Sequence, residues 1–260
     1  FGSVVVGSDS VLQTTISNPD TTALVISNLT SSNIQYTFSP NAFPVTILPG
    51  GNQVFDVTYT PTALGLSTAD LTFTHNATGS PTVYSLQGTG VEPGFGISPA
   101  SLDFGSVIVG TNSILPVTIT NTGTSDLVIS NITSSDVHYT FAPNTFPITI
   151  GSGLNQIINV TFAPTTSGLV TGNLTITHNA TGSPTIYSLQ GTGVEATFAI
   201  APPNLNFGNV VLGSNATLQA TVSNPGTSNL VISNIISSNL QYTFSPNVFP
   251  IIILPGGNQV

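Results

Sequence analysis

The sequence predicts an all-β protein of tandem, seven-stranded antiparallel β-sandwiches, and three observations indicate this. Short segments alternate apolar and polar residues with a period of two, and Gly, Pro and Asn separate them. Apolar spacings typical of helices are nearly absent. A block of about one hundred residues, the size of one folding domain, recurs along the chain without a gap.

This internal repeat defines the expected domains. FGSVVVG at Phe1 returns as FGSVIVG at Phe104 and FGNVVLG at Phe207, a constant interval of 103 residues. We expect a first repeat at 1–93 that lacks its first strand, a complete repeat at 94–196, and the N-terminal part of a third at 197–260. Half a sandwich exposes apolar surface and open strand edges. We therefore expect the chain to continue into further copies, or a neighbouring subunit to supply the missing strands.

The complete repeat contains about seven strand-like segments. They lie near 114–120, 127–132, 137–141, 146–150, 158–162, 174–176 and 186–189. Seven short strands with turns between them are typical of an immunoglobulin-like sandwich, although the Cys pair and core Trp of antibody domains are absent. We expect one face of each sheet to be buried and the other to be solvated by Thr, Ser and Asn. The Gly-rich GTG and PGG stretches are expected to form turns at strand ends.

The joints between repeats are predicted to be short. They fall at 91–95 and 194–198, with Pro93 in the first and Pro202–Pro203 just past the second. Short, Pro-containing connections limit swivelling. The array should therefore be a semi-rigid rod with about 40 Å per domain.

Composition excludes several classes of function. The chain has no Lys, Arg or Cys, three His and nine Asp and Glu, with a net charge of −9. Without cations it has no electrostatic driving force for binding nucleic acid or anionic membranes. Without Cys it forms no disulfides. Its apolar runs are far shorter than the ~20 residues of a membrane span, so we expect no membrane insertion within this segment.

No pattern predicts a catalytic, metal or cofactor site. The acidic residues form no D-x-D-x-D cluster, and Glu92, Asp103 and Glu195 near the joints are too few for a calcium cage. A zinc site needs three or four converging donors, whereas the His residues are isolated. We expect these His residues to have structural or surface roles. They are His75 and His178, at the same repeat position, and His138.

Seven N-x-S/T sequons are candidate glycosylation sites. Asn76 and Asn179 lie in the polar THNATGSP loop and are the preferred candidates. The others are Asn28, Asn131, Asn159, Asn173 and Asn215.

The repeat resembles the ASH/Hydin-type immunoglobulin-like repeats, which are relatives of the major sperm protein sandwich. The bacterial surface version is the choice-of-anchor D domain. The resemblance implies seven-stranded sandwiches in tandem that serve as structural or binding modules and not as enzymes. The chain departs from the family in lacking basic residues, which argues against a microtubule-associated role, and in having Pro19 and Pro225 where the second repeat has Thr122. The residues that carry the resemblance are Phe104, Gly105, Val107, Gly110, Asn121, Gly123, Leu127, Ile129, 178–184 and 189–193.

Two hypotheses of function follow. The first is a non-enzymatic extracellular structural array, either a stalk, a surface fibre or a filament, in which near-identical domains set the length. It would have further copies of the repeat, or other chains of its own kind, as partners. The alternative is a cell-surface adhesin whose loops bind a glycan or protein through repeated weak sites.

Overall fold

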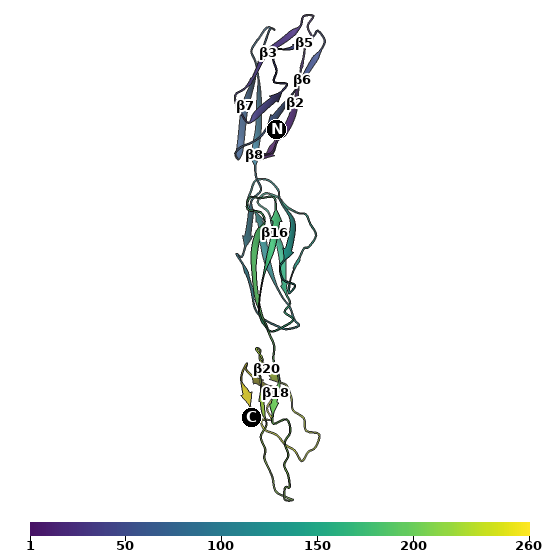
Figure 1. The fold of residues 1–260 in the computed structure, drawn as a ribbon, viewed down its shortest axis with the longest axis vertical. Helices are drawn as coiled ribbons and strands as arrows, with labels where there is room; N and C mark the ends of the chain where they lie inside the picture. Colours follow the sequence, from purple (N-terminus) through teal and green to yellow (C-terminus); the bar gives the residue numbers. More distant parts are fainter.

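The computed structural model describes all residues 1–260 and contains strands without helices. Three β units follow one another along the long axis (Figure 1). The prediction of an all-β fold built from sandwiches is confirmed. No helix in the structure has the length and apolarity needed to cross a membrane.

The middle unit is a two-layer sandwich. One sheet has the order β10-β17-β16-β12-β14 and the other the order β13-β15-β11-β9. Two strands, β9 and β10, precede the seven segments expected from the sequence. The bounds are β9 (Phe95–Ser98), β10 (Leu102–Ile108), β11 (Ser113–Asn121), β12 (Leu127–Ser134), β13 (Tyr139–Ala142), β14 (Ile148–Ile150), β15 (Asn155–Phe162), β16 (Gly168–His178) and β17 (Thr185–Val194).

The first unit repeats this arrangement without a counterpart of β9. Its sheets have the orders β1-β8-β7-β3-β5 and β2-β6-β4. The bounds are β1 (Ser3–Val5), β2 (Ser10–Ser17), β3 (Leu24–Ser31), β4 (Tyr36–Ser39), β5 (Val45–Ile47), β6 (Asn52–Tyr59), β7 (Gly65–His75) and β8 (Thr82–Val91).

The third unit is much less regular. Its sheets have the orders β18-β19-β22 and β20-β21. Residues 197–260 contain no counterparts of β16 and β17, and Asn224 and Ile253 are the only buried residues among them. The bounds are β18 (Ala199–Ala201), β19 (Thr221–Ser223), β20 (Leu230–Ile232), β21 (Ile251–Ile253) and β22 (Asn258–Gln259).

One strand pair in each of the first two units is parallel, so the expectation of a purely antiparallel sandwich is wrong on this point. β10 lies parallel to β17, and β1 lies parallel to β8. The physical reason is topological. Neither β1 nor β10 is joined to its parallel partner by a hairpin, and only strands joined by a hairpin must be antiparallel.

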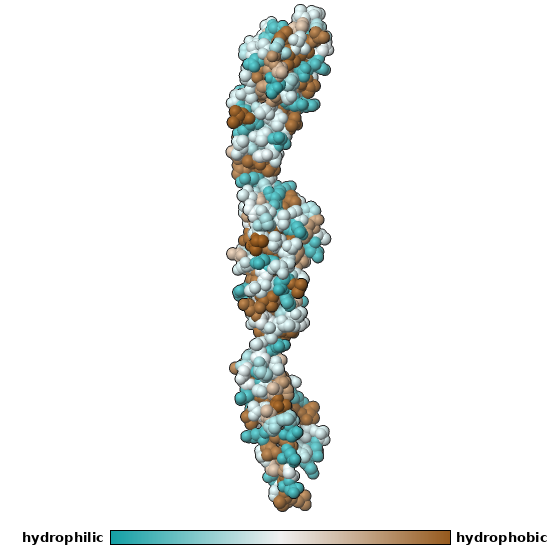
Figure 2. Space-filling view, in the orientation of Figure 1, coloured by the Kyte–Doolittle hydropathy of each residue, from teal (hydrophilic) through white to brown (hydrophobic).

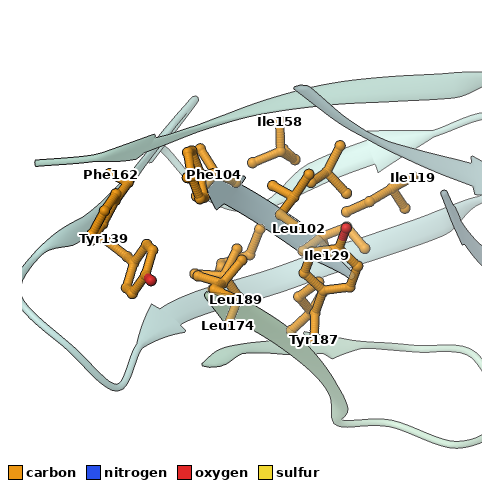
Figure 3. Packing of buried hydrophobic residues seen from close by; sticks show 14 of the residues in the cluster. Leu102, Phe104, Ile119, Ile129, Tyr139, Ile158, Phe162, Leu174, Tyr187 and Leu189 are labelled. Atoms are coloured by element: carbon orange, nitrogen blue, oxygen red, sulfur yellow. The ribbon is translucent and has the colours of Figure 1, made fainter. Parts of the chain in front are cut away.

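Each complete layer pair encloses an apolar core. In the middle unit, aromatic rings occupy one end of the core, where Tyr139 stacks on Phe162 with centroids 4.9 Å apart, and Phe104 packs against both (Figure 3). Branched aliphatic side chains from both sheets fill the remainder (Figure 3). The first unit has the equivalent pair, Tyr36 stacked on Tyr59 at 4.5 Å.

The GTG stretches are not turns, contrary to expectation. They lie inside β8 and β17, and Gly191 and Gly193 are buried. A Cβ on Gly191 would lie 2.5 Å from Cε1 of Phe162, so the glycine makes room for the core ring. The PGG stretch at Gly50 does form a turn, with a φ of 72° at Gly50.

Val137 was expected to alternate with Tyr139 in a strand, and this is also wrong. It lies in the turn before β13 and is 89% exposed.

Candidate functional site: the joints between repeats

At the first joint, the hydrogen bonds of two consecutive residues go to different units. Val91, the last residue of β8, pairs with Val5, and its carbonyl accepts a 2.9 Å hydrogen bond from the Val6 N–H. The next residue, Glu92, is bonded to the following unit. Its carbonyl accepts hydrogen bonds from the N–H groups of Thr124 at 2.8 Å and Ser125 at 3.1 Å. Consecutive residues are therefore fixed to consecutive repeats.

The loop that contains Thr124 and Ser125 makes further hydrogen bonds to the linker. The Glu92 N–H donates to Thr124 Oγ1 at 3.1 Å, and the Thr122 N–H donates to the Gly94 carbonyl at 3.2 Å. The loop lies between β11 and β12 of the middle unit. The linker 92–94 therefore belongs structurally to the repeat that follows it.

The second joint reproduces the first. The Val109 N–H donates to the Val194 carbonyl at 2.9 Å, which fixes the end of β17. The Glu195 carbonyl accepts from the N–H groups of Thr227 at 2.7 Å and Ser228 at 2.9 Å, and the Glu195 N–H donates to Thr227 Oγ1 at 3.0 Å. These bonds recur at both joints and indicate one repeated geometry. The Thr122 bond to Gly94 has no counterpart at the second joint, because Pro225 has no N–H.

A buried asparagine lies at the centre of each joint. Asn121 is 0% exposed and uses all of its side-chain hydrogen-bonding capacity. Its Nδ2 donates to the carbonyls of Ser125 at 2.7 Å and Ile150 at 2.8 Å. Its Oδ1 accepts from the N–H groups of Gly123 at 2.9 Å and Gly94 at 3.1 Å. One side chain thus connects the linker, the β11–β12 loop and the end of β14.

Asn224 makes the same four bonds at the second joint. Its Nδ2 donates to the carbonyls of Ser228 and Ile253, and its Oδ1 accepts from the N–H groups of Gly226 and Thr197. In the first unit, the equivalent Asn18 bonds Thr22, Ile47 and Asp20. The sequence analysis quoted Asn121 as part of a motif but gave it no role. The sequence feature that could have indicated this role is an Asn at the same position of all three repeats.

Glycines at both joints permit close approach of the linker. A Cβ on Gly123 would overlap the Glu92 carbonyl oxygen and the Gly94 nitrogen, and a Cβ on Gly226 would overlap the Glu195 carbonyl oxygen. Neither glycine has a positive φ, so contact, and not backbone conformation, requires glycine. Any larger residue would push the linker away from the loop.

Comparison with known proteins identifies the family. The sequence profile described as "Abnormal spindle-like microcephaly-assoc'd, ASPM-SPD-2-Hydin" (ASH) matches residues 1–83 and 91–186. The chain belongs to the ASH family. The resemblance inferred from the sequence motifs is thereby confirmed. Among curated proteins, none matches the chain.

Solved structures are similar to the chain only at low identity and low TM-score. A protein of unknown function from Porphyromonas gingivalis W83 is 13% identical over 73% of this chain and 93% of its own, with a TM-score of 0.35. The ASH/PapD-like domain 7 of human CEP192 is 17% identical over 40% of this chain and 87% of its own, with a TM-score of 0.32. WR4, a C. elegans MSP family member, is 11% identical over 38% and 96%, with a TM-score of 0.28. Similarity at this level supports no conclusion about function.

The three His residues of the ASH repeats lie apart. No three or more His, Asp or Glu side chains gather into a group that would hold a metal ion. His178 stacks on Phe95 with centroids 4.2 Å apart and planes at 5°. Its Nδ1 accepts from the Ala180 N–H at 3.2 Å, and its Nε2 lies 3.0 Å from Thr185 Oγ1. Burial lowers the pKa of His178.

His75 and His138 have different surroundings. His75 makes the same loop contacts as His178, but its ring is partly exposed because the first unit has no counterpart of Phe95. His138 Nδ1 lies 2.7 Å from Asp136 Oδ1, and its Nε2 lies 2.9 Å from Thr165 Oγ1. The backbone N–H of His138 donates to the same carboxylate and lowers the pKa of Asp136.

The two preferred sequons hold the THNATGSP loop to the neighbouring strand. Asn179 Nδ2 donates to the Asp126 carbonyl at 3.1 Å, and its Oδ1 accepts from the Val128 N–H at 2.8 Å. Asn76 makes the equivalent bonds to Ala23 and Val25. Both are exposed, but a glycan on Nδ2 would compete with these bonds. Of the others, Asn173 is half-buried, and Asn28, Asn131, Asn159 and Asn215 are exposed.

Proposed function

We propose that this chain is part of a non-enzymatic, extracellular structural array, a stalk or surface fibre whose length is set by the number of ASH repeats. The observation that carries the proposal is the joint, where adjacent residues are fixed to adjacent repeats by the same hydrogen bonds twice. Such a short joint, bonded on both sides, would keep successive sandwiches in one orientation. Copy number then determines the reach of the rod.

Family membership supports a structural role. ASH and related immunoglobulin-like domains are generally non-catalytic. The residues whose side chains or close approach hold the joints are the same in both repeats: Asn121 and Asn224, Gly123 and Gly226, and Thr124 and Thr227 are identical pairs. Selection for a specific binding site would instead favour one repeat that differs from the others.

Composition supports the extracellular location that we propose. A chain without Lys or Arg offers no site to trypsin-like proteases. Its nine carboxylates and three imidazoles are few, so its charge changes little over a wide range of pH. Its surface mixes polar and apolar residues along the whole length (Figure 2).

Small-angle X-ray scattering of the full chain tests the rod. We expect a maximum dimension of about 120 Å, from three units of about 40 Å, and a narrow cross-section. Gly123→Ala should bend or loosen the first joint and shorten this dimension. Gly151→Ala is the matched control, because its new methyl would meet only the exposed side chain of Leu154. A wild-type chain as compact as the Gly123→Ala variant would contradict the proposal.

The location needs its own test. Antibodies raised against the chain should label intact cells that carry the gene. Labelling that requires permeabilised cells would contradict an extracellular role and leave the rod unaffected.

One observation favours binding through repeated weak sites as a second candidate function. The turn before β4, the turn before β13 and the equivalent segment of the third unit each present a nearly fully exposed aliphatic side chain. These side chains are Ile34 at 92%, Val137 at 89% and Leu240 at 96%. Such sites would gain strength from avidity. A screen of the chain against glycans and proteins should then detect binding. This binding should weaken in the triple variant Ile34→Ser, Val137→Ser, Leu240→Ser.

A further inference from the structure

The chain passes through the middle repeat from one end to the other (Figure 1). It arrives through Glu92 and leaves through Val194, at the two joints described above. Between these points, β10 and β17 lie side by side in parallel, from Leu102 opposite Leu189 to Ile108 opposite Val194. Both strands run toward the second joint, where β17 ends. β10 starts opposite Leu189, part-way along β17, and is connected to the first joint through β9.

We propose that this parallel pair is a tension-bearing clamp that resists extension of the array. Tension between the joints pulls the start of β10 toward the first joint and the end of β17 toward the second. The two strands must then slide along each other. Ladder hydrogen bonds lie across the strands, so sliding strains all of them together, whereas separating the strands from one end breaks them one at a time.

Several contacts strengthen β10 against sliding. Leu102, Phe104 and Val107 are buried in the core, so sliding would also drag apolar side chains through packed surroundings. Gln190 Nε2 on β17 donates to Asp103 Oδ2 on β10 at 2.7 Å. The Val109 N–H donates to the Val194 carbonyl beyond the last register pair.

A second pair lies in series with the first. β9 pairs antiparallel with β11, from Phe95 opposite Asn121 to Ser98 opposite Thr118. Tension on Phe95 also acts along its strand, so this pair is sheared as well. β9 therefore takes the load first and β10 second. In the first unit, β1 and β8 repeat the parallel pair, with Ser3 opposite Thr89 and Val5 opposite Val91.

The clamp is a property of strand direction, so it goes beyond the proposed role as a length-setting rod. Small-angle scattering measures the overall dimensions of the chain, whereas single-molecule pulling measures the resistance of the β10–β17 pair to force. Failure of one experiment is thus distinguishable from failure of the other.

Single-molecule pulling on the full chain tests the direction dependence directly. The chain has no cysteine, so engineered cysteines are its only thiols. One variant carries Ala100→Cys and Ala196→Cys, which load β10 and β17 from opposite ends. The matched variant carries Asn112→Cys and Ala196→Cys, which load the pair from one end. All three sites are exposed and lie outside the strands, and equal thermal melting confirms that both variants fold alike.

We expect the folded lifetime at constant force to be at least about tenfold longer in the Ala100/Ala196 direction, because several ladder bonds rupture together. Equal lifetimes in the two directions would overturn the proposal.

A side-chain variant gives a second readout. Gln190→Ala removes the bond to Asp103 and should shorten the lifetime in the Ala100/Ala196 direction by about threefold to tenfold. Gln156→Ala is the control, since its side chain bonds only the neighbouring Ile157 carbonyl on β15. Equal effects of the two substitutions would show that the β10–β17 contact carries no particular load.

Discussion

Asn121 is a polar side chain with no exposed surface, and its four hydrogen bonds make it the residue on which the joint depends most. Asn121→Ala would remove the side-chain partner of two carbonyls and two N–H groups, of which the Ile150 carbonyl is buried and the others are partly buried. We expect it to lower the free energy of unfolding of the middle repeat by about 3 to 5 kcal/mol. Urea unfolding measures this loss. Hydrogen exchange should show reduced protection at 92–94 and 121–125.

The control for this prediction is Asn159→Ala, because Asn159 is exposed on β15. It should change the unfolding free energy by less than about 0.5 kcal/mol. A similar small change for Asn121→Ala would mean that water replaces the lost bonds and that the asparagine does not hold the joint.

His178 gives the repeat a dependence on acid. Burial lowers the pKa of His178 in the folded state, so the unfolded chain takes up a proton first as the pH falls. Stability is therefore complete at neutral and higher pH and should decrease as the pH falls below about 6.5. Urea unfolding at pH 7.5 and 5.5 measures the decrease.

His178→Gln should remove most of this dependence, since glutamine does not titrate. Asp136 acts in the same direction as His178 but in a lower pH window. Its lowered pKa gives stability that is lost only at more acidic pH, below about 4. An unchanged slope between pH 7.5 and 5.5 in His178→Gln would place the acid sensitivity elsewhere.

Residue types alone could not reveal these two roles. The sequence showed Asn121 and His178 at repeated positions and predicted a structural or surface role for the histidine. The stacking of Phe95 on His178 brings together residues far apart in the sequence. Burial of Asn121 likewise depends on the linker at Gly94 lying against the β11–β12 loop. Such contacts follow from the tertiary fold and not from local pattern.

At the scale of the strands, period-two alternation predicted most of the middle repeat. The segments at 114–120, 127–132 and 158–162 lie within β11, β12 and β15. Alternation reports which face is buried but not which strand is the neighbour, so it did not distinguish the parallel β10–β17 pair. It also failed where glycine has no side chain to alternate, in the GTG stretch of β17.

The buried glycines of β17 lead to a prediction about strand packing. Gly191→Ala would place a methyl group against the Phe162 ring. We expect a loss of about 1 to 3 kcal/mol in unfolding free energy from overpacking. The double variant Gly191→Ala, Phe162→Leu should be less destabilised than the sum of its two single variants, because the smaller side chain makes space. Strict additivity in this urea-unfolding cycle would show that the ring and the glycine do not interact.

At the scale of the whole molecule, cohesion comes from apolar cores and backbone hydrogen bonds, because ion pairs are almost absent. The one pair in the structure joins His138 and Asp136. Nine carboxylates over 15226 Å² of surface are on average on the order of 40 Å apart, well beyond the Debye length of about 8 Å. Neither attraction nor repulsion between charges therefore contributes much to folding.

Stability should consequently be almost independent of ionic strength. We expect the free energy of unfolding at pH 7.5 to change by less than about 0.5 kcal/mol between 0.02 and 0.5 M NaCl, since only weak, screened charge interactions are affected. Urea titrations at the two salt concentrations measure it. A pair introduced at Asp103 by Gln190→Lys supplies the comparison, because its stabilisation should decrease with salt. A large salt dependence of the unfolding free energy in the wild-type chain would contradict this prediction. It would mean that interactions between charges contribute substantially to the stability of the repeats.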